Sequence, residues 1–152
     1  MFNVVLVHPE IPNNTGNIGR LCLGSGARLH LIKPLGFELD NTRLKRAGLD
    51  YWPHIDVTIY ENFEEFLHKN KPSKMAFLTS HSQKIYTEIP FEKDLFIIFG
   101  KESQGLDHEL IQQYCDQCYK IPMYSPKIRS LNLANAVGIV LYEGLRQYSI
   151  AK

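Results

Sequence analysis

The stretch Leu95–Leu106, LFIIFGKESQGL, decides the fold. Its first five residues, Leu95–Phe99, are apolar throughout, which is typical of a central strand covered on both faces. A turn bounded by two glycines, Gly100–Gly105, follows directly. In α/β domains, ligands usually bind at loops that leave the carboxyl ends of strands. The stretch therefore predicts a buried strand that ends in a ligand-facing loop.

Short apolar runs of the same kind alternate with helix-like segments elsewhere in the chain. Further strands are predicted at Val4–Val7, Leu29–Ile32, Val57–Tyr60, Met75–Thr79 and Tyr119–Ile121. Helices are predicted from about Thr15 to Gly24 with Gly26 as end signal, from Asn62 with Glu65 as its capping partner, and over Leu131–Gln147. This alternation predicts one α/β domain over residues 1–152, with a mostly parallel sheet flanked by helices.

Three loops follow predicted strands and are candidates for ligand binding: Pro9–Asn14, Gly100–Gly105 and Pro122–Arg129. The last helix adds a second clue, because little of its surface is polar. Its apolar residues are Leu133, Ala134, Ala136, Val137, Ile139, Val140, Leu141 and Leu145. Such a helix is buried on more than one side, either between the sheet and its neighbours or against a second copy of the chain. We expect the second copy.

Composition points to a soluble globular protein, with 44% hydrophobic and 22% charged residues among 152. Met1–Val7 lacks the features of a secretory signal. The odd, sparse set of cysteines, Cys22, Cys115 and Cys118, indicates a reducing compartment, so we expect a cytoplasmic protein. The net charge of +1 gives no general nucleic-acid signal. Basic residues gather only locally, at Arg43, Lys45 and Arg46 and at Lys127 and Arg129, where solvated surface is the simpler interpretation.

Several familiar motifs are excluded. Leu106 and Asp107 stand where a nucleotide-binding P-loop needs Lys and Ser or Thr, and no GxGxxG follows a strand. Cys115 and Cys118 form a lone CxxC without the further ligands that zinc needs, so no metal is expected. Neither a GxSxG nor a histidine pattern supports a hydrolase. A small-molecule or redox enzyme using the two cysteines stays an alternative.

The string NTGNIGR, Asn14–Arg20, has a different character. Its two glycines, Gly16 and Gly19, remove side-chain bulk near a helix start, and Arg20 lies about a turn and a half into the helix counted from Asn14. An arginine there can reach a backbone phosphate of a bound nucleic acid, although a plain surface arginine is common.

Three strings taken together resemble the SPOUT superfamily of RNA methyltransferases: NTGNIGR, LFIIFGKESQGL and IPMYSPKIRSLNLANAVGIVLYE (Ile121–Glu143). The stretches PEIPNNTGNIGRLC (Pro9–Cys22), PLGF (Pro34–Phe37) and LKRAGLDYW (Leu44–Trp52) are similar to its TrmL (YibK-like) group, which methylates the 2′-oxygen of the tRNA wobble nucleotide. The resemblance covers essentially the whole chain, with no appended RNA-binding domain. One departure is the loop Tyr124–Ile128, which is one residue longer than the family pattern.

The resemblance implies an α/β fold with a C-terminal trefoil knot, a homodimer through the last helix, and S-adenosyl-L-methionine as cofactor, released as S-adenosyl-L-homocysteine. The cofactor would lie against Leu78, Thr79, Gly100, Gly105, Ile121, Met123, Ser130 and Leu131. Catalysis would involve Arg20, Asn14, Asn132 and Tyr142. Phosphate contacts to tRNA would come from Arg43, Lys45, Arg46, Lys127 and Arg129.

The role of Arg20 follows from its chemistry. Because an arginine stays protonated in proteins, it does not suit the part of a simple base. We expect Arg20 to clamp the adjacent phosphate and to stabilise the developing oxyanion, while a phosphate oxygen or water takes the proton. Glu102 is expected to orient its loop or a basic neighbour. Two alternative functions on the same fold stay open: methylation of ribosomal RNA, and RNA binding without catalysis.

Overall fold

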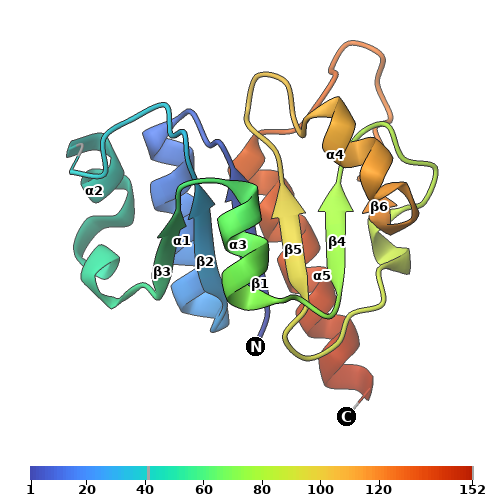
Figure 1. Cartoon of the computed structure of the whole chain (residues 1–152), viewed down its shortest axis with the longest axis horizontal. Coiled ribbons are helices and arrows are strands. Elements are labelled where there is room, and N and C mark those ends of the chain that lie inside the picture. The colour runs from blue at the N-terminus through green and yellow to red at the C-terminus, as the bar shows by residue number, and fades with distance from the viewer. Residues whose placement is uncertain (41, 152) are drawn as a thin grey trace.

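The computed structural model describes residues 1–40 and 42–151, and its centre is a parallel sheet (Figure 1). Within the described residues the sheet has six strands in the order β3-β2-β1-β5-β4-β6. The strands are β1 (Asn3–Val7), β2 (Arg28–Ile32), β3 (Val57–Tyr60), β4 (Met75–Leu78), β5 (Phe96–Phe99) and β6 (Cys118–Tyr119). All neighbouring pairs run parallel, which confirms the predicted α/β class.

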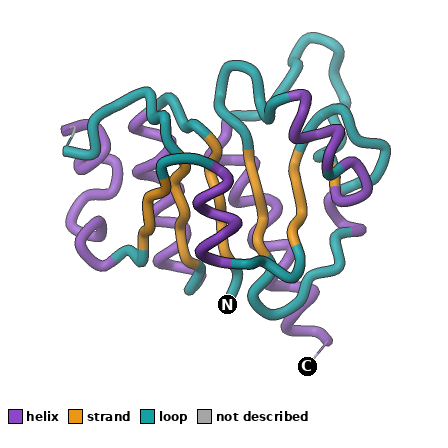
Figure 2. The backbone as a smooth tube through the Cα atoms, viewed as in Figure 1, coloured by secondary structure: helices purple, strands orange, loops and turns teal. Residues whose placement is uncertain are grey.

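Helices cover both faces of the sheet, as the tube view shows (Figure 2). They are α1 (Pro12–Ser25), α2 (Thr42–Gly48), α3 (Phe63–Asn70), α4 (His108–Gln113) and α5 (Leu133–Ala151), with short 3-10 turns η1 (Leu49–His54), η2 (Tyr86–Glu88) and η3 (Cys115–Gln117). Alternate residues of β1 enter two apolar clusters. Val4 and Leu6 join α1 and α5, whereas Val5 and Val7 join α3. No helix in the described ranges is long and apolar enough to cross a membrane.

The helix ends show where local signals hold and where they fail. Gly26 ends α1 in the left-handed conformation, with φ of 74°, as predicted. However, α1 begins at Pro12 rather than at Thr15, because a proline fits the first helical turn without an N–H to satisfy. The expected start of the last helix at Leu131 is also wrong. Asn132 caps α5 instead, its Oδ1 accepting the backbone N–H of Ala134 at 2.9 Å.

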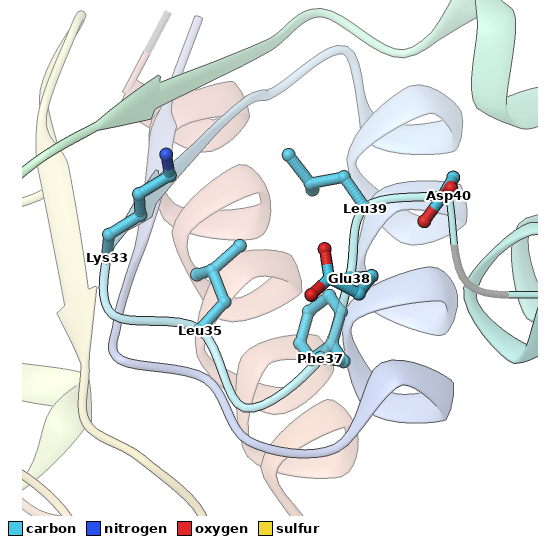
Figure 3. Close-up of a pocket in the computed structure, with 6 residues that line it drawn as sticks. All are labelled: Lys33, Leu35, Phe37, Glu38, Leu39 and Asp40. Atoms are coloured by element: carbon cyan, nitrogen blue, oxygen red, sulfur yellow. The ribbon is translucent and has the colours of Figure 1, made fainter.

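The loop between β2 and α2 packs closely on the loop that precedes α1. The N–H of Gly36 donates to the carbonyl of Pro9 at 2.9 Å, and a Cβ on Gly36 would lie 2.8 Å from the Glu10 Cα. This loop also shapes an open hollow of about 470 Å³ (Figure 3). All of the lining side chains come from this one loop: Lys33, Leu35, Phe37, Glu38, Leu39 and Asp40. None of them is a predicted site residue.

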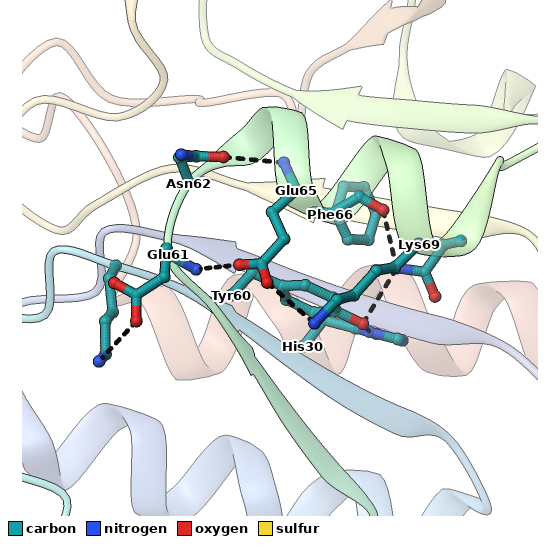
Figure 4. A network of polar contacts seen from close by, with 9 residues as sticks. His30, Tyr60, Glu61, Asn62, Glu65, Phe66 and Lys69 are labelled. Carbon is teal, nitrogen blue, oxygen red and sulfur yellow. Dashed lines mark hydrogen bonds and ion pairs between the residues drawn. The ribbon is translucent and has the colours of Figure 1, made fainter.

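The polar network around α3 joins that helix to β2 and β3 (Figure 4). Asn62 caps α3 by accepting the Glu65 N–H at 2.8 Å, as predicted. In the interior, His30 lies between the Asn3 Oδ1 and the Tyr60 hydroxyl, each at 2.9 Å. Since the Asn3 oxygen only accepts, the His30 Nε2 carries the proton and the Tyr60 hydroxyl donates to Nδ1. Burial lowers the pKa of His30 to about 4.

Candidate active site

A cavity of about 770 Å³ lies where β4 and β5 end and α5 begins. The three predicted ligand-facing loops all contribute to its wall, through Ile11 and Asn14, through the turn at 100–105, and through Met123 and Arg129. The wall also contains every residue expected to hold the cofactor: Leu78, Thr79, Gly100, Gly105, Ile121, Met123, Ser130 and Leu131. Residues from separate parts of the sequence therefore meet around one space.

The turn after β5 requires glycine at its first position. A Cβ on Gly100 would lie 2.1 Å from both the Gly105 carbonyl carbon and the Leu106 nitrogen, far inside any real contact. Gly105 has a φ of 71° and its N–H donates to the Lys101 carbonyl at 2.8 Å, which closes the turn. Gly100 is thus a close-approach position and Gly105 a left-handed one.

Glu102 fastens this turn to the start of α1. Its carboxylate accepts the backbone N–H of Glu10 at 2.9 Å and that of Ile11 at 2.7 Å. In return, the Glu10 carboxylate accepts the Ser103 N–H at 2.8 Å, and this bond lowers the pKa of Glu10. Glu102 thus orients its loop, as expected, and its partners are two backbone N–H groups and the Asn14 amide rather than a basic side chain. The reciprocal role of Glu10 was not predicted, since it lies 93 residues from Ser103.

Two of the four predicted catalytic residues lie together at the cavity. The Asn132 Nδ2 donates to the Asn14 Oδ1 at 3.1 Å, and the Asn14 Nδ2 donates to Glu102 at 3.3 Å. Asn14, Glu102 and Asn132 therefore connect the start of α1, the turn after β5 and the start of α5. This arrangement fixes three walls of the cavity relative to one another.

The other two predicted catalytic residues lie outside the wall of this cavity. Arg20 is exposed on α1, with its guanidinium carbon 5.0 Å from the centre of the Tyr51 ring. Tyr142 is 49% exposed on α5. Within a single chain, the structure brings together Asn14 and Asn132 but not Arg20 and Tyr142.

The predicted basic residues fall into two groups. Arg129 lines the cavity and Lys127 lies on the exposed loop beside it. Arg43 and Arg46 are exposed on α2, whereas the side chain of Lys45 lies outside the described part of the structure. Lys101, which sequence reasoning passed over, also lines the cavity because it belongs to the turn after β5.

The two cysteines of the CxxC pair differ in exposure and in their surroundings. Among the described residues, no group of three or more His, Cys, Asp or Glu could hold a metal ion. Cys115 is exposed and Cys118 is buried, and both are free thiols. The Cys118 thiol donates to the Tyr114 carbonyl at 3.3 Å, and burial raises its pKa. A raised pKa makes a thiol less reactive at neutral pH.

Comparison with known proteins places these observations in a family. Residues 1–142 match the SpoU rRNA Methylase family. A tRNA (cytidine(34)-2'-O)-methyltransferase of Aeromonas hydrophila is 46% identical over 152 residues, covering 99% of this chain and 97% of that protein. A solved structure concerned with 2-OH methylation of C/U34 on tRNA is 41% identical, has a TM-score of 0.93, and matches over 100% of this chain and 98% of its own. An AdoMet-bound rRNA methyltransferase from Sinorhizobium meliloti is 25% identical with a TM-score of 0.85, covering 96% of this chain and 56% of that one.

Proposed function

Because this chain belongs to the SpoU rRNA methylase family, we propose that it methylates the ribose 2′-hydroxyl of the tRNA wobble nucleotide, cytidine or uridine 34, using S-adenosylmethionine. The relatives at 41–46% identity over nearly the full chain support this substrate. The observation that carries the proposal is the cavity, whose wall contains all eight residues expected to hold the cofactor.

The wall of the cavity suits a nucleoside cofactor. Leu78, Ile121 and Leu131 offer apolar surface for an adenine ring, and the strand ends offer backbone N–H and C=O groups. Thr79 and Ser130 add hydroxyls that suit ribose oxygens. S-adenosylmethionine, when bound, supplies an activated methyl group on its sulfonium. The residues of the chain then have to hold the acceptor hydroxyl in line with that methyl group and exclude water.

Arg20 serves in this proposal as the group that holds the phosphate next to the target ribose. A guanidinium can form two parallel hydrogen bonds to a phosphate and can stabilise the negative charge that develops on the 2′-oxygen. The proton passes to a phosphate oxygen or to water. Asn14 and Asn132 keep the acceptor side of the cavity in shape through their shared hydrogen bond. Arg20→Lys, which loses the bidentate geometry, should then lose most of the activity.

A homodimer through α5 belongs to the same proposal. One side of α5 packs in the core through Val137, Val140 and Leu141, while Ile139, Tyr142 and Ile150 are exposed on the same helix. Exposed large apolar side chains along one helix support contact with a second copy. Arg20 and Tyr142 lie off the cavity of their own chain. In a dimer, they would act at the cavity of the partner subunit. Sedimentation at micromolar concentration should give twice the 17.5 kDa of the chain.

The trefoil knot implied by the family resemblance is also part of the proposal. It rests on that resemblance, and the structure adds only that the chain leaving β6 at Lys120 runs against the long connection between β4 and β5 through two backbone hydrogen bonds of 2.8 Å. The Tyr86 N–H donates to the Lys120 carbonyl, and the Lys120 N–H donates to the Lys84 carbonyl.

We expect tRNA to be held through its phosphates in the cytoplasm. Arg129 and Lys127 lie at or beside the cavity, and Arg43 and Arg46 are exposed on α2. Neutralising phosphates releases counterions, so tRNA affinity should fall steeply as salt rises. The Lys127→Ala and Arg129→Ala variants should each reduce the slope of log affinity against log salt by about one. An affinity that does not change with salt would contradict this mode of binding.

Incubation of the protein with labelled S-adenosylmethionine and either tRNA or ribosomal RNA tests the proposed activity. Transfer to tRNA at nucleotide 34 is the expected result. Transfer to ribosomal RNA alone would make the alternative substrate correct. Binding of tRNA without any methyl transfer would identify the chain as an RNA-binding module on this fold.

A further inference from the structure

Arg20 stacks on an aromatic ring that no part of the proposed mechanism uses. Its guanidinium carbon lies 5.0 Å from the centre of the Tyr51 ring, within the range of a cation–π contact. Tyr51 belongs to η1, lies 31 positions along the chain from Arg20, and is 41% exposed. The contact therefore forms on the surface of the folded protein and not within one helix.

The packing beneath this contact is close, and it explains Gly19. A Cβ on Gly19 would lie 2.8 Å from the Ile55 Cδ1 and 3.0 Å from the Trp52 Cζ3. The absence of a side chain at Gly19 thus lets η1 approach α1 directly beside Arg20. Ile55 is buried and Trp52 packs against the main apolar cluster, so this end of η1 is anchored in the core. Packing in the core therefore fixes the position of Tyr51 relative to Arg20.

The geometry leaves the hydrogen-bonding edge of Arg20 available. The contact places the guanidinium carbon over the Tyr51 ring and uses none of the five N–H donors in a hydrogen bond. Among the described residues, nothing forms a hydrogen bond or ion pair with the Arg20 guanidinium. The stack therefore restrains the long side chain without using the groups that a phosphate would need.

We propose that Tyr51 is a positioning residue that holds Arg20 ready for a substrate phosphate, with Gly19 setting the distance between the two elements. This inference rests on the proposed function of Arg20 in methyl transfer to RNA. Without the ring, an exposed arginine samples many rotamers and must be ordered when RNA binds. The loss should then appear in the rate of transfer and not in the affinity for the cofactor.

Two measurements on Tyr51→Leu and Tyr51→Phe test the proposal. The first is NMR of the Arg20 side-chain protons, which the ring should shift upfield in the wild type and in Tyr51→Phe but not in Tyr51→Leu. The second is steady-state methylation of tRNA. Tyr51→Leu should lower kcat about fivefold, the size expected for loss of one cation–π contact, and Tyr51→Phe should restore it. Affinity for S-adenosylhomocysteine should be the same in all three proteins.

A double-mutant cycle separates positioning from a general structural effect. In an Arg20→Ala background, Tyr51→Leu should have no further effect on kcat. Arg28→Ala serves as the charge control. Arg28 is also exposed, but it lies at the start of β2 and forms an ion pair with Asp56. Equal losses from Tyr51→Leu with and without Arg20, or an unshifted Arg20 spectrum in the wild type, would overturn the proposal. A wild-type protein that stacks as described but methylates no RNA would instead overturn the proposed function, and the positioning role with it.

Discussion

Replacing Gly100 by alanine should open the turn after β5 and damage the cavity. The added Cβ would lie 2.1 Å from two backbone atoms of residues 105 and 106, whereas real contacts of this kind stay above 3.0 Å. The backbone must therefore move by about 0.9 Å, the difference between these two distances. A flexible side chain could give way, but here both neighbours are main chain. The closing hydrogen bond from Gly105 to Lys101 should lengthen or break.

The free energy of unfolding should fall by about 3 kcal/mol, from about 2 kcal/mol for overpacking and about 1 kcal/mol for one lost hydrogen bond. With a urea dependence of about 2 kcal/mol per M, this corresponds to a midpoint lower by roughly 1.5 M. Because the moved atoms line the cavity, calorimetric titration with S-adenosylhomocysteine should show an affinity at least about tenfold weaker. An unchanged midpoint together with unchanged affinity would show that the turn accommodates a Cβ at Gly100.

Gly24→Ala is the matched control for this experiment. Gly24 lies in α1, and a Cβ there would meet no atom within 4 Å. Alanine in a helix should stabilise the protein by about 0.5–1 kcal/mol relative to glycine. The two substitutions add the same methyl group, so opposite shifts of the urea midpoint would isolate the steric effect at Gly100.

Three further predictions concern His30, Glu102 and the cysteines. The pKa of His30 is about 4 in the folded protein against 6.5 when exposed, so the stability it contributes is full above pH 6.5 and is lost as pH falls toward 4. The free energy of unfolding measured in urea should therefore be about 2 kcal/mol lower at pH 5 than at pH 7, and His30→Gln should reduce this difference. An equal pH dependence in both proteins would show that His30 is not its source. Glu102→Gln leaves one side-chain oxygen for two backbone N–H donors, so the free energy of unfolding should fall by about 1–3 kcal/mol and cofactor affinity should weaken. The substitution Glu38→Gln, at an exposed carboxylate, should change neither quantity. Unchanged stability and affinity in Glu102→Gln would show that these hydrogen bonds have no energetic role. Serine at both Cys115 and Cys118 should leave methyl transfer intact, and loss of activity without unfolding would reinstate the redox interpretation.

Local patterns in the sequence were enough to predict the sheet and several helix ends. The apolar run at 95–99 became the buried β5 because its composition suits burial on both faces, and Gly26 and Asn62 ended and began helices through their own backbone and side-chain chemistry. The segment containing α2 and η1 gave no comparable signal. It lacks a long apolar period, and it is held by packing against α1 that only the folded chain creates.

The same division applies to the candidate site. Strand ends predicted which loops would meet, and the family resemblance supplied the eight residues expected to hold the cofactor, which line one cavity. The hydrogen bond from the Ser103 N–H to the Glu10 carboxylate joins residues 93 positions apart, and neither residue lies in a local pattern that predicts it. The sequence also gave no indication that Arg20 lies off the cavity of its own chain and on the Tyr51 ring, because both facts depend on how α1 packs.

Mass spectrometric mapping of ribose methylation shows directly whether the protein methylates the wobble ribose of tRNA. Unmodified tRNA is incubated with the protein and isotopically labelled S-adenosylmethionine, digested, and its nucleosides are assigned to positions. We expect label on the 2′-oxygen of cytidine or uridine 34, with most of it lost in the Arg20→Lys protein. Label on a base, on another position of the tRNA or only on ribosomal RNA would contradict it.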